Sequence, residues 1–274
     1  MKFILRQLIA LIGIGMFFFV SELPAVAGEL TGKQIIDEVA RRHDRPNEFE
    51  KQIMTLIDRK GNEEKREVRM YSREFEGGLS RYLITFDSPA GVRGVALLTW
   101  QNEGASDDQW TFLPALGRKL KRTAEGNKRN YFMGTDFANE DLVSEDRSKY
   151  VYERLADQKL DGVDHFVVRT YPNTEDLKNE SGYKFRDFFV RKDIFFIMRT
   201  DYFDRRGRFL KRQTVTSEPY KASGEMYFAD IRLLDNKKEK HQTRVEVIHR
   251  DLSQAAVPKA NFKKRYLTSK QHMR

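Results

Sequence analysis

The residues that could perform chemistry in this chain are its carboxylates and histidines, and neither group shows the spacing of a catalytic motif. Adjacent carboxylates at Asp107–Asp108 and Glu140–Asp141 could act as a general acid and base, but the chain holds 41 Asp and Glu residues, so such pairs carry little information. The sequence contains no serine-nucleophile elbow, no zinc-protease motif and no glycine-rich phosphate loop. The histidines show no metal-ligand spacing: His43, His165, His241, His249 and His272. We therefore expect a protein that is not an enzyme and that has no metal and no cofactor.

Cysteine is absent from the chain, which excludes disulfides, thiolate nucleophiles, cysteine metal sites and an acylated N-terminal cysteine. The aromatic fraction of 12% argues against a disordered charged chain, although 33% of the residues are charged.

Apolar side chains in the middle of the chain indicate binding rather than catalysis. The stretch from Tyr131 to Leu142 is broken by glycine and looks like a loop, with a short helix that Asp136 could cap and that Glu140 and Asp141 would favour through the helix dipole. Its apolar residues could simply pack under a long loop, or they could form a mobile lid over an apolar groove. Aromatic and methionine side chains adapt to ligands of variable shape. The candidate binding residues in the apolar groove and lid are Tyr82, Ile84, Phe86, Leu97, Trp110, Phe112, Tyr131, Phe132, Met133 and Phe137.

One helix and a long series of strands would have to position these residues. Thr31 and Gln34 form a capping box at the start of a helix that runs to about His43, and Asp44-Arg45-Pro46 ends it. From Phe49 onward apolar residues alternate with polar ones, and glycine-containing turns separate the segments. The pattern predicts roughly eleven to thirteen antiparallel strands in a single domain, and a sheet of that size must curl, split or close.

The first 27 residues are predicted to be a cleavable signal peptide. Lys2 and Arg6 precede an apolar run, and Ala25-Val26-Ala27 has the small-residue pattern of a cleavage site. The run is too short for a typical membrane-spanning helix, so an uncleaved anchor is the weaker interpretation. We expect the mature protein to begin near Gly28 and to be exported.

The formal net charge of +9 is concentrated in two places. Residues 259–274 form a tail that has basic residues and no carboxylate, and a second basic cluster lies between Arg118 and Arg129. These charges could be a solvated strand edge and a frayed terminus, or they could attract an anionic membrane surface or an acidic partner. Because we expect the chain to be exported, nucleic acid is not an expected partner.

The stretch from Gly91 to Leu142 resembles the outer-membrane lipoprotein-sorting family, the LolA-like group. The resemblance is carried by three parts of this stretch. They are Gly91-Val92-Arg93-Gly94 with Trp100, then Trp110-Thr111-Phe112-Leu113-Pro114 with Arg118 and Arg122, and finally Met133-Gly134-Thr135-Asp136-Phe137 with Glu140-Asp141-Leu142.

The resemblance implies a mainly β (α+β) fold, in which a single curved antiparallel sheet of about 11 strands forms an incomplete β-barrel and helices cover its concave face. Residues 28–258 would form this domain, followed by the basic tail at 259–274. The implied function is a periplasmic carrier that holds the acyl chains of a lipoprotein or lipid in a vacant apolar groove between the inner and outer membranes. An inner-membrane exporter and an outer-membrane acceptor are the implied protein partners.

Two other classes of function stay open. A periplasmic adaptor of an exporter would use the same curved sheet without carrying lipid, and it would have a concave side filled by its own side chains. An exported hydrolase of lipid or glycan would need a cleft with a nucleophile or with two suitably spaced carboxylates.

Overall fold

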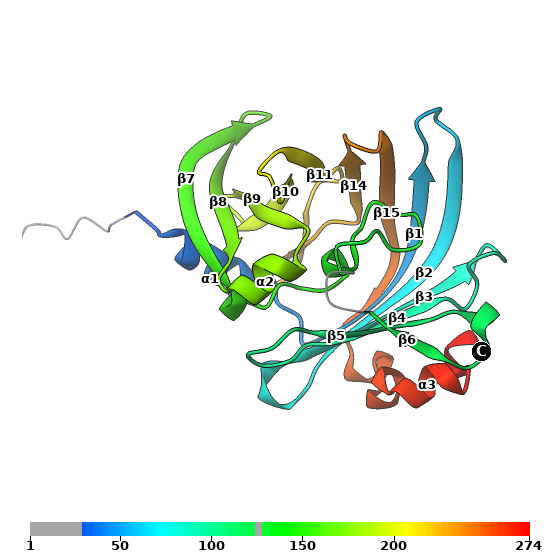
Figure 1. Cartoon of the computed structure of the whole chain (residues 1–274). Coiled ribbons are helices and arrows are strands. Elements are labelled where there is room, and N and C mark those ends of the chain that lie inside the picture. The colour runs from blue at the N-terminus through cyan, green and yellow to red at the C-terminus, as the bar shows by residue number, and fades with distance from the viewer. Residues whose placement is uncertain (1–28, 124–127) are drawn as a thin grey trace, which may run out of the picture.

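The structure, a computed structural model, describes residues 29–123 and 128–274. The predicted signal peptide therefore lies outside the described residues. Thirteen strands form one antiparallel sheet in the order β6-β5-β4-β3-β2-β1-β15-β14-β11-β10-β9-β8-β7, and β12 and β13 form a separate two-stranded sheet (Figure 1). The large sheet curves strongly but does not close, since β6 and β7 remain its two edges.

Helix α1 (Gly32–His43) precedes the strands, and the first six strands form a simple meander. Their bounds are β1 (Asn47–Ile57), β2 (Glu63–Glu74), β3 (Ser80–Ser88), β4 (Ala96–Trp100), β5 (Asp108–Phe112) and β6 (Leu120–Arg122). The second half of the sheet consists of β7 (Tyr150–Leu160), β8 (Val163–Pro172), β9 (Tyr183–Arg191), β10 (Phe196–Asp204), β11 (Phe209–Val215), β14 (Ile231–Asn236) and β15 (His241–Asp251). The remaining elements are β12 (Tyr220–Ser223), β13 (Met226–Phe228), α2 (Glu175–Glu180) and α3 (Lys264–Thr268).

The predicted fold class is confirmed: one curved antiparallel sheet forms an incomplete barrel. Its thirteen strands fall within the eleven to thirteen that the alternation predicts, and exceed the about 11 that the resemblance implies. The predicted first helix is confirmed as well. The Thr31 hydroxyl accepts a hydrogen bond from the Gln34 backbone N–H at 3.2 Å, and the Thr31 backbone N–H donates to the Gln34 side chain at 2.9 Å. This reciprocal pair satisfies backbone groups that the first turn leaves unpaired.

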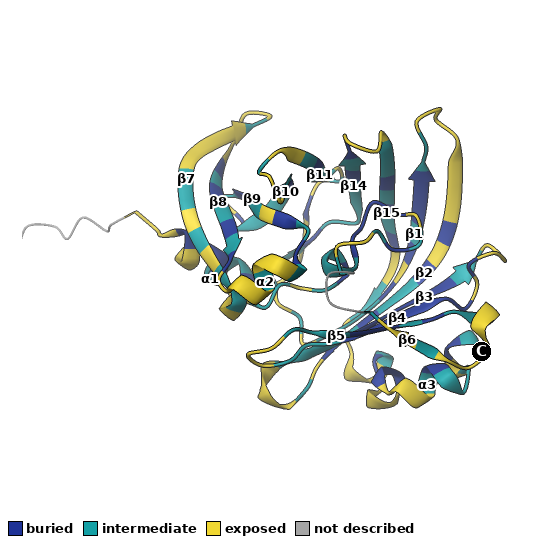
Figure 2. Ribbon diagram, viewed as in Figure 1, coloured by how far each residue is buried: buried dark blue, intermediate teal, exposed yellow. Residues whose placement is uncertain are grey.

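Different parts of the chain cover the two faces of the sheet, and many residues of the central strands are buried, as the dark blue bands of Figure 2 show. On the concave face, helix α1 packs Ile35 and Ile36 against Val168, Phe188 and Val190 of β8 and β9. The long connection between β6 and β7 covers the concave face of the first four strands. We call its described part, residues 128–149, the cover segment.

The convex face of β2 to β5 is covered by the last residues of the chain. We call residues 253–274 the C-terminal cap. Its side chains Phe262, Leu267 and His272 are almost completely buried, at 0%, 0% and 1% exposure. The segment predicted as a basic tail is therefore a folded part of the domain, even though most of its Lys and Arg side chains point into solvent.

The helix expected at Asp136 is not present. The cover segment instead contains a short 3₁₀ turn, Asn139–Leu142. The Asp141 carboxylate accepts a hydrogen bond from the N–H of Ala138, the residue just before this turn, at 2.7 Å. The Asp136 carboxylate accepts from the Thr243 hydroxyl at 2.8 Å and lies 2.7 Å from the His241 ring. The prediction that Asp136 caps a helix is wrong because this side chain anchors the cover segment to β15.

Candidate functional site

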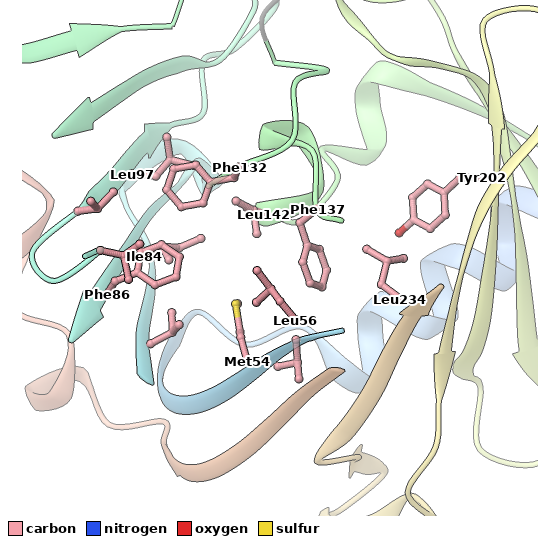
Figure 3. Close-up of a cluster of buried hydrophobic side chains, with 14 of the residues drawn as sticks. Met54, Leu56, Ile84, Phe86, Leu97, Phe132, Phe137, Leu142, Tyr202 and Leu234 are labelled. Carbon is pink, nitrogen blue, oxygen red and sulfur yellow. The ribbon is translucent and has the colours of Figure 1, made fainter. Parts of the chain in front are cut away.

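The concave face of β1 to β4 presents a continuous row of apolar side chains. Because successive residues of a strand point to opposite faces, the strand register brings Ile84 opposite both Met70 and Leu97, and Phe86 opposite Val68. We call the following buried residues the apolar strip: Met54, Leu56, Val68, Ile84, Phe86 and Leu97 (Figure 3). Each of them is 6% exposed or less.

The cover segment fills the space above the apolar strip with its own side chains. Phe132, Phe137 and Leu142 belong to the same buried cluster as the strip and are 4–5% exposed. The rings of Phe86 and Phe132 have centroids 5.7 Å apart. The expectation of a vacant apolar groove is therefore wrong for this conformation. The residues that fill it come from a connection without long helices or strands, not from the sheet.

A buried ion pair holds the middle of the cover segment against the sheet. The Lys211 Nζ on β11 lies 2.6 Å from the Asp141 carboxylate and donates to the Asp136 carbonyl at 2.7 Å. The two charged side chains are 0% and 2% exposed. The Tyr183 hydroxyl also donates to Asp141, at 2.8 Å, and burial together with that carboxylate keeps the Tyr183 pKa well above its ordinary value. The phenol thus stays protonated and available as a donor.

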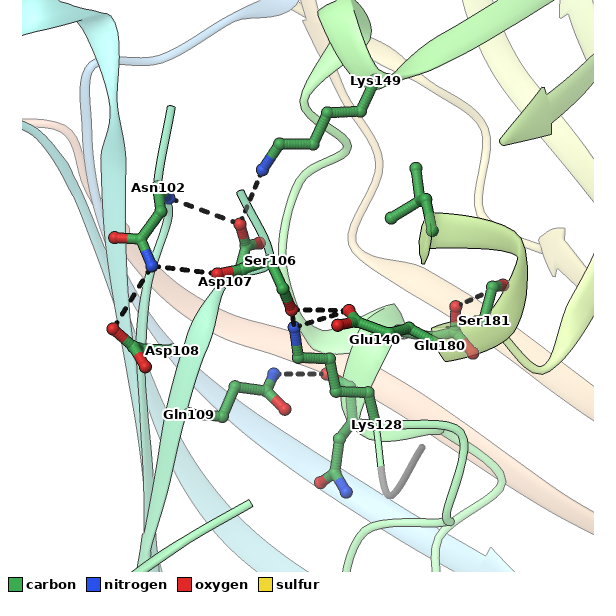
Figure 4. A network of polar contacts seen from close by, with 12 residues as sticks. Asn102, Ser106, Asp107, Asp108, Gln109, Lys128, Glu140, Lys149, Glu180 and Ser181 are labelled. Atoms are coloured by element: carbon green, nitrogen blue, oxygen red, sulfur yellow. Dashed lines mark hydrogen bonds and ion pairs between the residues drawn. The ribbon is translucent and has the colours of Figure 1, made fainter. Parts of the chain in front are cut away.

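Further polar contacts fix both ends of the cover segment (Figure 4). Near its start, Lys128 contacts Glu180 at 3.1 Å, and near its end Lys149 contacts Asp107 at 2.8 Å. Glu140 is half-buried, and its carboxylate accepts from the Ser181 hydroxyl at 2.7 Å and from the Gly182 N–H at 2.8 Å. Burial, reinforced by the adjacent Asp141 carboxylate, raises the Glu140 pKa.

The carboxylate pairs noted in the sequence are thus occupied with structural contacts. Asp107 pairs with Lys149 and Asp108 with Arg122, while Glu140 and Asp141 hold the cover segment. Within residues 29–123 and 128–274, no three His, Asp or Glu side chains gather in a way that could hold a metal ion.

The structure divides the predicted lipid-binding residues between the two faces of the sheet. Tyr82, Ile84, Phe86 and Leu97 face the concave side, as expected. Trp110 and Phe112 face the convex side, because the register places them opposite Leu98 and Ala96. There they are buried under the C-terminal cap at 6% and 0% exposure, so the expectation that they line the groove is wrong.

The four predicted residues of the cover segment lie at different depths. Phe132 and Phe137 are buried on the apolar strip, and Met133 packs partly against it. Tyr131 is less buried, and its hydroxyl accepts a hydrogen bond from the Asn236 side-chain amide at 2.9 Å.

A cavity of about 210 Å³ remains at the end of the concave face where β1 begins. We call it the polar cavity. Apolar residues of the strip side border it, namely Met54, Met70, Phe137 and Leu142. The charged residues that border it are Arg45, Glu48, Glu50, Asp141 and Arg232. Burial raises the pKa of the Glu48 carboxyl to about 7, whereas Arg232 and Arg250 hold the pKa of Glu50 below its ordinary value against the opposing effect of burial.

Our sequence interpretation did not identify the residues of the polar cavity or Lys211. One signal was present: Glu48, Glu50 and Gln52 occupy the same alternating positions as Met54 and Leu56, so they must share a face with them. Charged residues that continue an apolar row on one face of a strand indicate a polar region at the end of that face.

The C-terminal cap joins the two basic clusters that are separate in the sequence. Lys264 Nζ lies 3.8 Å from the Trp110 ring centroid, and Trp110 is paired with Arg122 of β6. The two clusters therefore meet at Lys264 and Arg122, and most of their basic side chains are exposed, namely Arg118, Lys119, Lys121, Arg122, Lys259, Lys263, Lys264, Arg265 and Arg274.

The fold is shared with several solved structures. A domain from Vibrio parahaemolyticus described as outer membrane lipoprotein-sorting is 29% identical with a TM-score of 0.78, and the alignment covers 86% of this chain and 98% of that domain. A LolA superfamily protein from Nitrosomonas europaea is 18% identical with a TM-score of 0.68 over 86% of this chain and 99% of that protein. A family model described as "Uncharacterized protein" matches residues 78–269, more than half of the chain. The chain belongs to the family of this model and has the LolA-like fold.

A further solved structure with a similar fold is a DUF1329 family protein from Desulfovibrio piger, which is 24% identical with a TM-score of 0.78 over 86% of this chain and 97% of that protein. No curated protein matches the chain at a significant level. In the part of this LolA-like protein that the structure describes, no helix combines the length and apolar character needed to span a membrane.

The family resemblance that the sequence suggested is thus confirmed. In this LolA-like protein the stretch from Gly91 to Leu142 builds β4, β5, β6 and the part of the cover segment that contacts the apolar strip.

Proposed function

We propose that this LolA-like protein is a periplasmic carrier, which shelters the acyl chains of a lipoprotein or lipid on its concave face between the inner and outer membranes. The observation that carries the proposal is that loop-borne side chains, not strands, fill the apolar strip. Movement of the cover segment would expose the strip without disturbing any strand pairing. Delivery to the periplasm would depend on the predicted signal peptide at residues 1–27.

The energetics of this exchange suit a carrier. Each CH₂ group of an acyl chain gains about 0.8 kcal/mol when it leaves water, so a lipid with two or three chains cannot cross an aqueous space unaided. When an acyl chain replaces Phe132, Phe137 and Leu142 on the strip, one apolar contact replaces another. The net affinity is then a small difference between two large terms, which lets the same protein load and unload. No covalent step is required.

The basic surface around the C-terminal cap supports docking to an anionic membrane. Lys and Arg residues near such a surface contribute about 1 kcal/mol each at moderate ionic strength. The cap places its basic residues on the convex side, away from the apolar strip, so docking would leave the cover segment unobstructed. An inner-membrane exporter as donor and an outer-membrane protein as acceptor belong to the same proposal.

The proposal is tested with a photoactivatable fatty acid bound to the full wild-type protein, with the labelled peptides mapped by mass spectrometry. We expect labels on β1 to β4 and on the cover segment. Labels restricted to residues of the convex face, such as Leu98, would overturn the assignment. Binding of the photoactivatable fatty acid should be saturable. Purified wild-type protein should also contain lipid that copurifies with it.

Two neighbouring residues provide a matched pair of variants. Leu83 and Ile84 are both buried, at 0% and 2% exposure, but Ile84 faces the apolar strip and Leu83 faces the C-terminal cap. Ile84→Asn is expected to lower fatty-acid binding, whereas Leu83→Asn, at a similar cost in stability, is expected to leave it unchanged in the folded fraction. Equal binding by the two variants would contradict the proposal.

The filled concave side favours a second candidate, a periplasmic adaptor that grips an exporter without carrying lipid. It predicts that the photoactivatable fatty acid labels no specific peptide and that purified protein contains no lipid. The same labelling experiment therefore separates the two candidates.

A further inference from the structure

We propose that the polar cavity binds the anionic headgroup of the carried lipid, a phosphodiester or carboxylate, with Arg232 as its principal ligand. This inference rests on the proposed carrier function, because it assigns the headgroup a place beside the strip that would hold the chains. Met54 and Leu142 belong both to the apolar cluster and to the wall of the cavity, so the two regions are continuous. A lipid with its chains on the strip would therefore have its headgroup at the cavity.

The other arginines near this cavity already have carboxylate partners. Arg45 lies 3.1 Å from Glu48, and Arg250 lies 2.8 Å from Glu50 and 3.2 Å from Glu48. Arg250 also contacts Asp230 at 3.1 Å. These contacts join the carboxylates at the start of β1 into a network that needs no further cation.

Arg232 differs from these arginines. It lies on β14, two residues before Leu234, and lines the cavity. Within the described residues its side chain makes no ion pair within 4.0 Å and no hydrogen bond. Its charge acts on Glu50 from a longer distance, since it helps to hold the pKa of that carboxyl down. The guanidinium therefore keeps its hydrogen-bond donors available to an incoming group.

The charged residues around the cavity favour a ligand group with a single negative charge. Arg45, Arg232, Glu48, Glu50 and Asp141 line the cavity. Asp141 is paired with Lys211, and Arg250, behind the lining, pairs with Glu48, Glu50 and Asp230, so each carboxylate has a cation other than Arg232 beside it. Burial keeps Glu48 partly protonated near neutral pH. The site then has an excess of positive charge. A guanidinium presents a planar fork of N–H groups that matches phosphate and carboxylate oxygens, and such charge-assisted bonds are strong away from bulk water.

Neutral donors surround the same space. Four residues with neutral polar side chains line the cavity: Ser72, Tyr82, Ser144 and Gln213. They could complete the hydrogen bonds of oxygens that Arg232 does not reach, which a headgroup needs when it leaves water.

The test compares two lipids with identical dioleoyl chains, phosphatidylglycerol and diacylglycerol, each delivered from cyclodextrin to the delipidated full-length protein. Arg232→Gln removes the charge at the cavity. Arg244→Gln is the matched control, because Arg244 lies on the adjacent strand β15, pairs with Glu246 at 2.8 Å and is 39% exposed. Inorganic phosphate is added as a competitor in a third arm.

We expect wild type and Arg244→Gln to bind phosphatidylglycerol about tenfold more tightly than diacylglycerol, and we expect Arg232→Gln to bind both within about twofold. Equal binding of the two lipids by wild type would overturn the inference but leave the carrier proposal in place. Failure to bind either lipid would overturn both. Displacement of phosphatidylglycerol by low concentrations of inorganic phosphate would identify a site for free anions and would overturn the assignment to a lipid headgroup.

Discussion

Replacement of Asp141 by Asn tests whether the buried ion pair controls the position of the cover segment. The substitution keeps the size of the side chain but leaves the Lys211 ammonium, which is 0% exposed, without a negative partner. Removing one member of a buried ion pair typically costs about 3–5 kcal/mol. If the cost falls on the docked cover segment alone, its opening equilibrium should rise by a factor on the order of a hundred or more, since 1.4 kcal/mol corresponds to a factor of ten.

Hydrogen exchange measured by mass spectrometry provides the assay. The backbone N–H groups of Phe132 and Glu140 donate within the cover segment, to Phe137 and Lys128 carbonyls at 2.8 and 3.0 Å, so peptides from this region report its opening. In Asp141→Asn these peptides should exchange about a hundredfold faster than in wild type, while peptides from β1 and β15 should be unchanged. Adding Lys211→Met should recover part of the protection, because it removes the unpaired charge.

Asp201→Asn is the matched control, because Asp201 is 7% exposed and pairs with Arg199 and Arg212 on another part of the sheet. It should leave the exchange of the cover segment unchanged. Two results would refute the reasoning. An increase of less than about threefold in Asp141→Asn would mean that the ion pair does not hold the cover segment. Equal acceleration across all strands would mean that the cover segment opens only when the whole domain unfolds, which also argues against the carrier proposal.

Three further predictions concern stability. Burial raises the pKa of Glu48 above the value of 4.5 expected in the unfolded chain, to about 7, so the folded form binds the proton more tightly and stability falls as pH rises between those values. In wild type the free energy of unfolding in urea should fall by about 1–3 kcal/mol between pH 5 and 7.5, and Glu48→Gln should remove this fall. The control Glu63→Gln, at an exposed position, should keep it. The same pH dependence in Glu48→Gln as in wild type would be contrary evidence. Phe262→Ala should cost about 3–5 kcal/mol and shift tryptophan emission to longer wavelength, because Trp100 and Trp110 both lie under the cap, whereas Phe209→Ala, at an exposed position, should do neither. Thr31→Ala should cost about 1 kcal/mol in thermal unfolding by removing the cap of α1, and a neutral result would show that the helix does not need it.

The features predicted correctly from the sequence depend on local patterns. The capping box at Thr31 and Gln34 involves residues three positions apart, so it can be predicted from the local sequence alone. Alternation within one strand correctly placed Tyr82, Ile84 and Phe86 on a common face.

The errors arose where a face or a contact depends on distant residues. Alternation shows that Trp110 and Phe112 share a face but not which face, and that choice depends on their pairing with Leu98 and Ala96. The role of Asp136 depends on Thr243, which lies 107 positions later in the chain. A helix cap and a long-range anchor require the same residue type, so the sequence alone could not separate them.

The position of β1 in the sheet has a consequence for how the chain acquires its fold. The first strand is not at an edge: it pairs with β2 on one side and with β15, the last strand, on the other. The two meanders, β1–β6 and β7–β15, are consequently joined within the sheet by a single ladder between residues that are about as far apart in sequence as the domain allows. During synthesis one side of β1 therefore stays unpaired until the chain has been made as far as Asp251, the last residue of β15. Such a high contact order predicts slow folding and a period of vulnerability to aggregation, in which a chaperone that shields β1 would be of most use.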